Sequence, residues 1–389
     1  LMKIFEHLDD SIDMPKDEAM VFDSVRALAR DKITPRAAAY DKSGDFPWDN
    51  VSDINSLGLN AMFVPEAYDG AALSYTVYLR CVREISKACA ATGVIWATNF
   101  HAMKPVIDFG DEAQKQRILP KVAAGALASL CITEPDAGSD ATAMRTSFTP
   151  DRDSIVVNGG KLFISNGGAS DFYLVFGKWS EIDDPRAAMS AVVIEKDTPG
   201  FSVGRKEDKM GIRASATTPL TFENCRIPRE NLLGAPGDGL KILLSSLNKS
   251  RPSVAAHALG IARAAFEDAV AYINQRKQSG SPIIGFQGVQ FMLADMATDL
   301  AMCESWLWHV ARMVDSNAPD FSAEASMLKM RAADVAMRIA TDAVQLHGGY
   351  GYIKEYRVER LMRDAKICQI WEGANQIHRQ YIGRTFIEK

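Results

Sequence analysis

Residues 154–165 read SIVVNGGKLFIS, and they give a strong indication of β structure in the middle of the chain. Two short β-rich runs, residues 154–157 and 161–165, flank Asn158-Gly159. Asn-Gly between such runs is typical of a two-residue hairpin, because both residues tolerate positive φ. Short β-rich runs recur at residues 172–176, 191–194 and 218–222. The sequence therefore predicts a mostly antiparallel β domain in the middle of the chain.

Helical periodicity flanks this β region on both sides. Before it, apolar residues recur at three- and four-residue spacing between residues 17 and 125; after it, the same spacing covers residues 240–277, 288–316 and 321–347. Pro252 lies within the first of these later segments and is expected to bend it. We predict an α+β chain with an N-terminal helical domain (1–126), a central antiparallel β domain (127–238) and a C-terminal helical bundle (239–389).

Composition narrows the classes of function. The formal net charge of -5 gives no basic footprint for nucleic acid, and no apolar run approaches the roughly 18 residues of a membrane span. The acidic N-terminus does not resemble a leader, so we expect a cytoplasmic protein, or one of the mitochondrial matrix if a leader was removed before Leu1. The 6 cysteines are scattered without metal-ligand spacing, which predicts reduced thiols and no metal site.

Three short segments are candidates for carrying chemistry. The chain contains neither a GxxxxGK phosphate loop nor a GxGxxG after a strand, which argues against nucleotide-triphosphate and nicotinamide enzymes. It does contain CITEPDAGSD at 131–140, QLHGGYGY at 345–352 and WEGANQ at 371–376. Taken singly, a structural turn, a helix stop and a carboxylate near a helix N-terminus explain these segments equally well or better.

Together the three segments resemble the signatures of the acyl-CoA dehydrogenase family, and the resemblance covers almost the entire chain. It implies an FAD-containing homotetramer whose C-terminal domain is a four-helix bundle. It also implies the reaction: Glu372 removes the α-proton of an acyl-CoA, a hydride leaves the β-carbon for the flavin, and trans-2-enoyl-CoA forms. Electrons would pass to electron-transferring flavoprotein, as in fatty acid β-oxidation. Some family members carry the base on the long helix after the β domain, where this chain has Ser250, which cannot act as that carboxylate.

The resemblance also implies which residues hold the cofactor and the substrate. FAD would be bound by Cys131, Thr133, Gly138, Ser139, Phe163, Ser165, Arg276, Gln278, Gln287, Gln345, Gly348, Gly349, Ala374 and Gln376. The acyl-CoA would be bound by Ser139, Asn99, Asn248, Arg251, Trp371 and Gly373. In the family, the residues matching Arg276, Gln287 and the Gly348-Gly349 pair reach the FAD of a neighbouring subunit. Ala374 replaces a customary threonine or serine, and Ser279 a customary phenylalanine, so weaker flavin binding is expected.

The sequence gives fewer indications of the acyl group and of the electron acceptor. Residues 96–101 (WATNFH) should line the acyl pocket with Trp371, and their bulk favours a short, branched or cyclic acyl group. His101 could contact a polar acyl group, although a lone histidine on a helix is more often structural; His378 receives no functional role. Two alternatives stay open: an acyl-CoA oxidase or flavin monooxygenase of the same fold, and a non-catalytic flavin-binding protein that serves in assembly or nucleic-acid binding.

Overall fold

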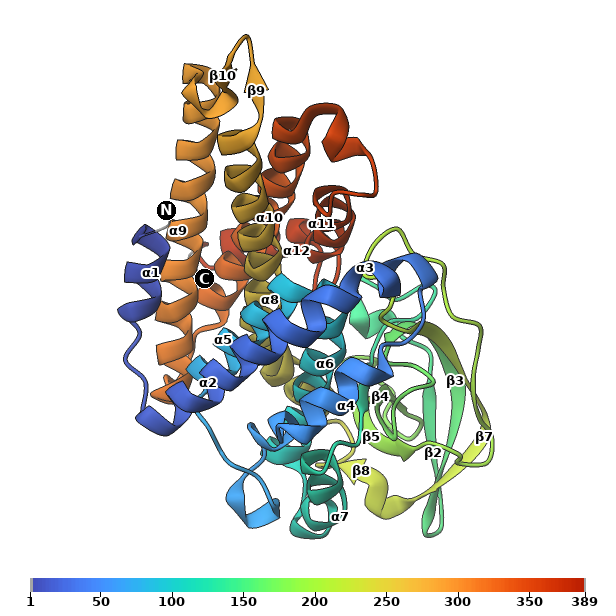
Figure 1. Ribbon diagram of the computed structural model, residues 1–389. Coiled ribbons are helices and arrows are strands. Elements are labelled where there is room, and N and C mark those ends of the chain that lie inside the picture. The colour runs from blue at the N-terminus through green and yellow to red at the C-terminus, as the bar shows by residue number, and fades with distance from the viewer. Residues whose placement is uncertain (1–2, 388–389) are drawn as a thin grey trace.

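A helical body lies beside a twisted sheet (Figure 1). In this computed structural model, which describes residues 3–387, the helices that precede the sheet are α1 (Lys3–Asp10), α2 (Lys16–Leu28), α3 (Thr34–Ser43), α4 (Trp48–Ser56), α5 (Tyr75–Ala88), α6 (Ala90–Phe109) and α7 (Glu112–Ala123). Their starts follow from local chemistry: the Ser74 hydroxyl accepts from Val77 N before α5, and Asp111 and Gln114 form a reciprocal capping box at α7. The predicted N-terminal helical region is confirmed.

One eight-stranded sheet occupies the middle of the chain. Its strands are β1 (Ala128–Cys131), β2 (Ser147–Asp151), β3 (Ser154–Ser165), β4 (Phe172–Trp179), β5 (Met189–Glu195), β6 (Phe201–Val203), β7 (Thr217–Pro228) and β8 (Leu232–Leu233). The order is β6-β7-β3-β2-β4-β5-β8, with β1 paired to β4. The pairs β1–β4 and β2–β4 are parallel, whereas the other strand pairs of this sheet are antiparallel. The prediction of a mostly antiparallel domain is confirmed.

The hairpin predicted at Asn158-Gly159 is wrong. The chain passes straight through these residues as one strand, β3, and both of its flanking runs pair with β7 across a register shift between Val157 and Gly159. Gly159 supplies the positive φ (137°) of this bulge, where a Cβ would lie 2.7 Å from Thr146 Cα. The real hairpin joins β2 to β3 earlier, since Asp151 pairs with Ser154 around Arg152-Asp153.

The sheet is buried on both faces where it meets the helices. In β4, Phe172, Leu174 and Phe176 pack into a core shared with α6 and α7, whereas Tyr173 and Val175 pack into a second core on the opposite face of the sheet. Alternate residues of a strand point to opposite faces, so a continuous apolar run can fill two cores at once. This packing fixes β1 and β4 against α6 and positions the segment that follows β1.

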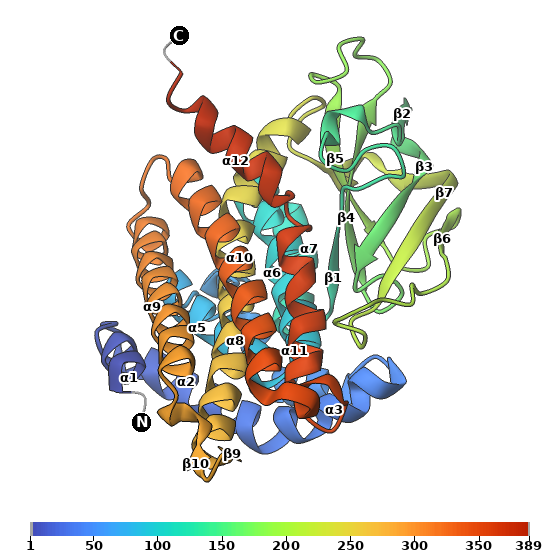
Figure 2. The same ribbon diagram turned by 90° about the horizontal axis from the view of Figure 1, so that it is seen from above.

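The C-terminal bundle consists of α8 (Gly239–Gln275), α9 (Gln287–Asp315), α10 (Ser322–His347) and α11 (Val358–Ala365), followed by α12 (Asn375–Arg384). The short strands β9 (Lys277–Gln278) and β10 (Ser281–Pro282) form the α8–α9 connection at one end of the bundle, while α12 lies toward the other end (Figure 2). The three long helices predicted from periodicity are confirmed within two residues at each end. Helix α8 remains a single helix through Pro252. Within residues 3–387, no helix combines the length and apolarity needed to cross a bilayer.

Helices α6 and α8 each pack closely against α5 at a glycine. A Cβ on Gly260 of α8 would lie 2.3 Å from the carbonyl oxygen of Arg83, and a Cβ on Gly93 of α6 would lie 2.1 Å from Ser86 Oγ. Both partners belong to α5. A side chain at either glycine therefore requires the helix backbones to separate.

We predict that Gly260→Val lowers the free energy of unfolding by about 1–3 kcal/mol, the usual cost of overpacking a core. Urea denaturation of the parent and the variant measures the difference. Gly285→Ala is the matched control, because no atom lies within 4 Å of its added Cβ. Equal midpoints for Gly260→Val and Gly285→Ala would contradict the close packing of α8 on α5.

Candidate active site

Glu372 lies in a strained segment just before α12. Its backbone φ is 52° and that of Gly373 is 91°, so two successive residues adopt left-handed conformations. For a residue with a Cβ this costs roughly 1–2 kcal/mol, and surrounding contacts must hold it in place. Glu372 Oε2 accepts a hydrogen bond of 2.7 Å from Ser250 Oγ, although the two residues are 122 positions apart in sequence. Ser250 is on α8, so the long helix and the segment before α12 meet at the Glu372 carboxylate.

Two buried side chains hold the backbone carbonyls of this segment. Lys329 Nζ on α10 donates to the Gly373 carbonyl oxygen at 2.6 Å, and His378 Nε2 on α12 lies 3.1 Å from the Glu372 carbonyl oxygen. Burial lowers the pKa of His378 to about 3, with Lys329 and Arg251 adding repulsion. The ring is therefore neutral at pH 7, and the carbonyl partner requires its proton on Nε2. Burial likewise lowers the pKa of Lys329 to about 8.

The sequence predicts no role for Lys329 or His378. For Lys329 a signal existed: it stands on the apolar face of α10, where Ala325, Ala332, Ala333 and Ala336 are buried at helical spacing around it. A lysine at such a position is rarely buried without a specific partner. For His378 the local sequence held no signal, because its partner is the backbone of Glu372.

Further polar side chains surround Glu372 on α6 and α8. Arg251 Nη1 donates to Asn248 Oδ1 and Ser326 Oγ, each at 3.2 Å; burial lowers the Arg251 pKa, and the charge of Glu372 opposes that change. The Trp371 ring centre lies 5.5 Å from that of His257. Among the described residues, His101 Nε2, His257 Nε2 and Trp371 Nε1 are buried without a hydrogen-bond partner. Such atoms are expected where a ligand completes a site.

His257 makes the stability of the protein depend on pH. It is 1% exposed, Ser86 Oγ lies 2.9 Å from its Nδ1, and burial lowers its pKa to about 3. A folded-state pKa below the unfolded value of 6.5 means that this stabilisation is complete above pH 6.5 and declines as the pH falls toward 3.

Between pH 6.5 and 5, His257 is expected to contribute a loss of about 2 kcal/mol, at roughly 1.4 kcal/mol per pH unit. His257→Gln removes this titration. We predict that the difference in unfolding free energy between pH 7 and pH 5 shrinks by that amount in the variant, as measured by urea denaturation at both pH values. An unchanged difference would mean that His257 is charged in the folded protein.

A second group of predicted residues gathers at the sheet edge after β1. Leu162 N donates to the Thr133 carbonyl oxygen at 2.8 Å, which places Thr133 beside Phe163. The Phe163 ring is 59% exposed on a backbone with φ of 60°, and Ser165 follows two residues later. An exposed aromatic residue in a strained conformation, with threonine and serine on neighbouring backbone, suits the flat heterocycle of a flavin. Cys131 ends β1 in a buried position, whereas Gly138 and Ser139 are exposed on the following segment.

Glu134 fixes this segment. Its carboxylate accepts from the buried Lys161 Nζ at 2.6 Å, from Arg145 N at 2.6 Å, and from the backbone and hydroxyl of Thr146 at 3.0 and 2.6 Å. Through these hydrogen bonds, Glu134 stabilises the conformation of the TEPDAGSD segment.

The remaining predicted cofactor residues lie at a different end of the molecule. Arg276, Gln278, Gln287, Gln345, Gly348 and Gly349 are all exposed. They lie near the α8–α9 connection and the end of α10, where the Arg276 guanidinium lies 5.5 Å from the Tyr350 ring centre. Along α10, Gly348 is about 28 Å from Lys329, at 1.5 Å per residue. Lys329 contacts Gly373, next to Glu372, so one chain does not bring these residues to Glu372. Figure 2 shows the β9–β10 connection and α12 toward opposite ends of the bundle.

Asn99, predicted to contact substrate, is occupied by structural contacts. It is 0% exposed, its Nδ2 donates to Asn60 Oδ1 at 3.1 Å, and its Oδ1 accepts from Ala128 N at 2.9 Å. The first bond ties α6 to the short helix Leu59–Ala61, and the second ties α6 to β1. We therefore propose no substrate contact for Asn99.

Two predicted cofactor residues lie at the start of α12. Ala374 is the N-cap residue and makes no side-chain hydrogen bond, and Gln376 is exposed.

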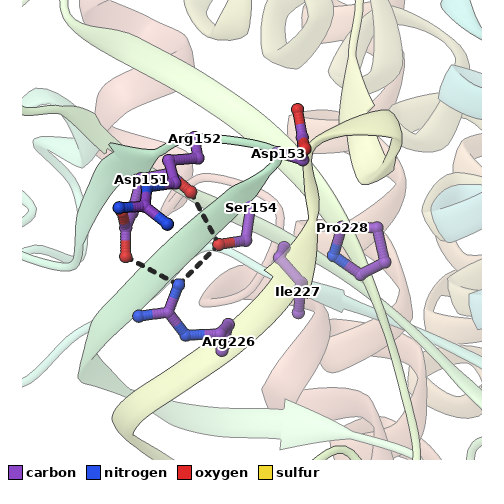
Figure 3. Close-up of a pocket in the computed structure, with 7 residues that line it drawn as sticks. All are labelled: Asp151, Arg152, Asp153, Ser154, Arg226, Ile227 and Pro228. Atoms are coloured by element: carbon purple, nitrogen blue, oxygen red, sulfur yellow. Dashed lines mark hydrogen bonds and ion pairs between the residues drawn. The ribbon is translucent and has the colours of Figure 1, made fainter.

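A surface hollow at the β2–β3 turn lies away from these groups (Figure 3). Arg226, which lines it, is bound at 2.7 Å to Asp151 and at 2.6 Å to Ser154 Oγ. The cation is thus already neutralised, and we assign the hollow no role. The described part of the chain contains no group of three or more His, Cys, Asp or Glu side chains arranged to hold a metal ion.

The architecture and the sheet-edge site match those expected of a flavin-dependent oxidoreductase. Three family models match the chain: Acyl-CoA dehydrogenase, N-terminal domain, at residues 15–126; the middle domain at 129–225; and the C-terminal domain at 237–387. The chain belongs to the acyl-CoA dehydrogenase family. It is an enzyme that uses FAD to dehydrogenate an acyl-CoA.

Individual relatives align over nearly the full length. An acyl-CoA dehydrogenase of Bacillus subtilis is 43% identical over 96% of this chain and 98% of its own. Butyryl-CoA dehydrogenase from Megasphaera elsdenii superposes with a TM-score of 0.94 at 36% identity, over 97% of this chain and all of the other. A chain solved in work on the electron transferring flavoprotein of Acidaminococcus fermentans superposes with a TM-score of 0.94 at 38% identity, over 97% and 100% of the two chains.

Proposed function

We propose that this enzyme converts a short, branched or cyclic acyl-CoA to the trans-2-enoyl-CoA, with Glu372 as the base that removes the α-proton. The observation that carries the proposal is the held geometry of Glu372: a carboxylate on a strained segment, with Ser250 bound to one of its oxygens. Removing a proton from the weakly acidic carbon beside a thioester requires such a positioned base. Bound FAD supplies the acceptor for the hydride from the β-carbon.

The chain's own residues divide the remaining tasks. Thr133, Phe163 and Ser165 would face the flavin ring, with Cys131, Gly138 and Ser139 beside them and Ala374 and Gln376 near the base. Arg251 and Asn248, which are bound to each other, would contact the CoA portion. Trp371 and Gly373 flank Glu372 and would close the site around the thioester, which keeps water from the reacting carbon.

A homotetramer would complete the cofactor site. The exposed residues Arg276, Gln278, Gln287, Gln345, Gly348 and Gly349 lie too far from Glu372 to reach the same flavin ring within one chain. A second copy that presents this end of its bundle to the cofactor would give these residues a ligand. We also propose the divisions 1–126, 127–238 and 239–389 as the domains of each subunit.

The preference for a small acyl group has support in the packing of α5 and α6. The Trp96 ring lies 5.3 Å from that of Tyr78, which stacks on Phe100 at 4.4 Å, all three being buried. These rings fill space that a long acyl chain would need. The likeness to butyryl-CoA dehydrogenase agrees with this preference, and the likeness to the chain from the A. fermentans study supports electron-transferring flavoprotein as the electron acceptor.

Anaerobic mixing of the FAD-loaded enzyme with a panel of acyl-CoAs tests the proposal. We expect butyryl-, isobutyryl- and cyclohexanecarbonyl-CoA to bleach the flavin absorbance much faster than palmitoyl-CoA does. Failure of every acyl-CoA to bleach the flavin would contradict the reaction, and faster bleaching by palmitoyl-CoA would contradict the small pocket. Reduction of electron-transferring flavoprotein, compared with oxygen uptake during turnover, separates a dehydrogenase from an oxidase.

A further inference from the structure

Two hydrogen-bond donors act on successive carbonyl groups of the Glu372–Gly373 segment. His378 Nε2 lies 3.1 Å from the Glu372 oxygen, and Lys329 Nζ lies 2.6 Å from the Gly373 oxygen. Both donors are buried, at 1% and 0% exposure, and they come from different helices, α12 and α10. We infer that Lys329 and His378 are positioning residues that together fix the direction of the Glu372 side chain. The inference rests on the proposed role of Glu372 as the base.

Backbone geometry explains why both donors are needed. The left-handed conformations of Glu372 and Gly373 turn their carbonyls away from any regular helix, so neither oxygen has a helical partner. A buried carbonyl without a donor is unfavourable, and the segment would otherwise relax toward ordinary φ values. Relaxation at residue 372 swings the Cα–Cβ bond and moves the carboxylate. The two donors therefore hold the side chain through the backbone and leave its oxygens free for Ser250 and substrate.

The glycine is part of the same arrangement. A Cβ on Gly373 would lie 3.0 Å from His378 Nε2, so the imidazole packs directly over the position where any other residue carries a side chain. With φ of 91°, Gly373 also adopts a conformation that other residues avoid.

A network of hydrogen bonds centred on Asn375 and Asp334 holds Lys329 in place. Lys329 Nζ also lies 3.2 Å from Asn375 Oδ1, and Asn375 Nδ2 donates to Met330 O at 3.1 Å and Asp334 Oδ1 at 2.8 Å. Asp334 also accepts from Gln369 at 2.7 Å and from Arg379 at 2.6 Å. This network joins α10, α12 and the segment before Glu372, so it holds Lys329 and the start of α12, the helix that carries His378, in a fixed relation.

Substitutions at both donors test the inference. In FAD-loaded enzyme, His378→Ala and Lys329→Met are expected to lower kcat by roughly 10²-fold, the effect of misplacing a reacting group by about 1 Å. KM and flavin content should change little, because neither side chain is assigned a contact with CoA or FAD. His378→Gln is the matched control: its amide can donate to the same carbonyl, and kcat should recover to within a few-fold of the parent.

The isotope effect supplies a readout that a purely structural role would not move. With substrate deuterated at the α-carbon, the effect on kcat should rise in His378→Ala and return toward the parent value in His378→Gln, because proton removal becomes slower only in the former. Parent-like kcat in both His378→Ala and Lys329→Met would overturn the inference. Should Lys329→Met not fold, the comparison of His378→Ala with His378→Gln decides: equal loss of kcat in the two variants also overturns it.

Glu372→Gln, assayed in parallel, distinguishes failure of the proposed base from failure of the proposed positioning residues. Full turnover in Glu372→Gln would overturn the proposed base itself. An inactive Glu372→Gln together with fully active Lys329→Met and His378→Ala would overturn only the positioning role.

Discussion

Glu372→Gln is expected to lower kcat by roughly 10²- to 10⁴-fold, the usual contribution of a positioned general base. The amide has nearly the shape of the carboxylate, and its oxygen can still accept the hydrogen bond from Ser250, which is 2.7 Å in the parent. It cannot accept the α-proton at neutral pH. Stopped-flow measurement of flavin bleaching under anaerobic conditions reports the rate of the chemical step directly.

The matched control for this substitution is Glu230→Gln, which removes the same charge at an exposed site in the turn before β8, where the side chain is 70% exposed. The control should bleach at the parent rate, and both variants should retain FAD and the parent melting temperature. If Glu372→Gln turned over as fast as Glu230→Gln, another residue would have to be the base, and the proposed mechanism would fail.

Glu304→Gln is expected to lower the free energy of unfolding by about 3–5 kcal/mol, the usual cost of breaking a buried ion pair. Glu304 on α9 is 0% exposed and binds Arg263 of α8 through two bonds of 2.8 and 2.6 Å, with Arg83 of α5 at 3.4 Å. Asp9, whose side chain is 24% exposed, binds Arg83 at 2.8 Å, but the two buried guanidinium groups share one fully buried carboxylate, that of Glu304. Its loss leaves their charge insufficiently compensated within the helical core. Urea denaturation and the melting temperature measure the effect.

The control is Asp23→Asn on α2. Asp23 and its partner Arg26 are 72% and 60% exposed and lie 3.6 Å apart, so solvent screens the pair and a change of less than about 1 kcal/mol is expected. A Glu304→Gln variant no less stable than Asp23→Asn would show that Asp9, which already lies 2.8 Å from Arg83 and 3.4 Å from Arg263, compensates the buried arginines sufficiently.

Regular periodicity made most of the fold predictable. Helix α10 buries one face at helical spacing, α8 is buried on all sides between Pro252 and Phe266, and α9 buries one face from Met296 onward. The apolar spacing of these segments is enough to locate the helices. The turn at Asn158-Gly159 could not be judged in the same way. Its residues suit a hairpin, but β7 runs alongside both flanking runs and pairs with them as one strand, and this long-range pairing decided the outcome. The true turn at Arg152-Asp153 has weaker turn chemistry, since a non-glycine residue, Arg152, adopts φ of 54° there.

The sequence predicts those residues of the candidate site that lie within a short motif. Glu372 and the TEPDAGSD segment carry signals in short stretches of sequence, whereas Lys329 acts on Gly373 from 44 positions away. Such a contact depends on how α10 and α12 cross, which no local pattern encodes. The sequence does not indicate a role for His378, because its partner is a backbone carbonyl, a group that every residue has. The place of Asn99 on a helix expected to line the pocket indicates a substrate contact, but its amide ties that helix to β1 and to Asn60 instead.

The hydrogen bond between Ser250 and Glu372 bears on which position in the chain could carry the carboxylate. It shows that the long helix and the segment before α12 present their side chains at a common point in space. A carboxylate introduced on the helix would therefore arrive where the present one already is, and the reaction would need no new pocket. If Glu372 is the base, as proposed, the carboxylate could then be carried by either segment, because the fold fixes its position in space and not its position in the sequence.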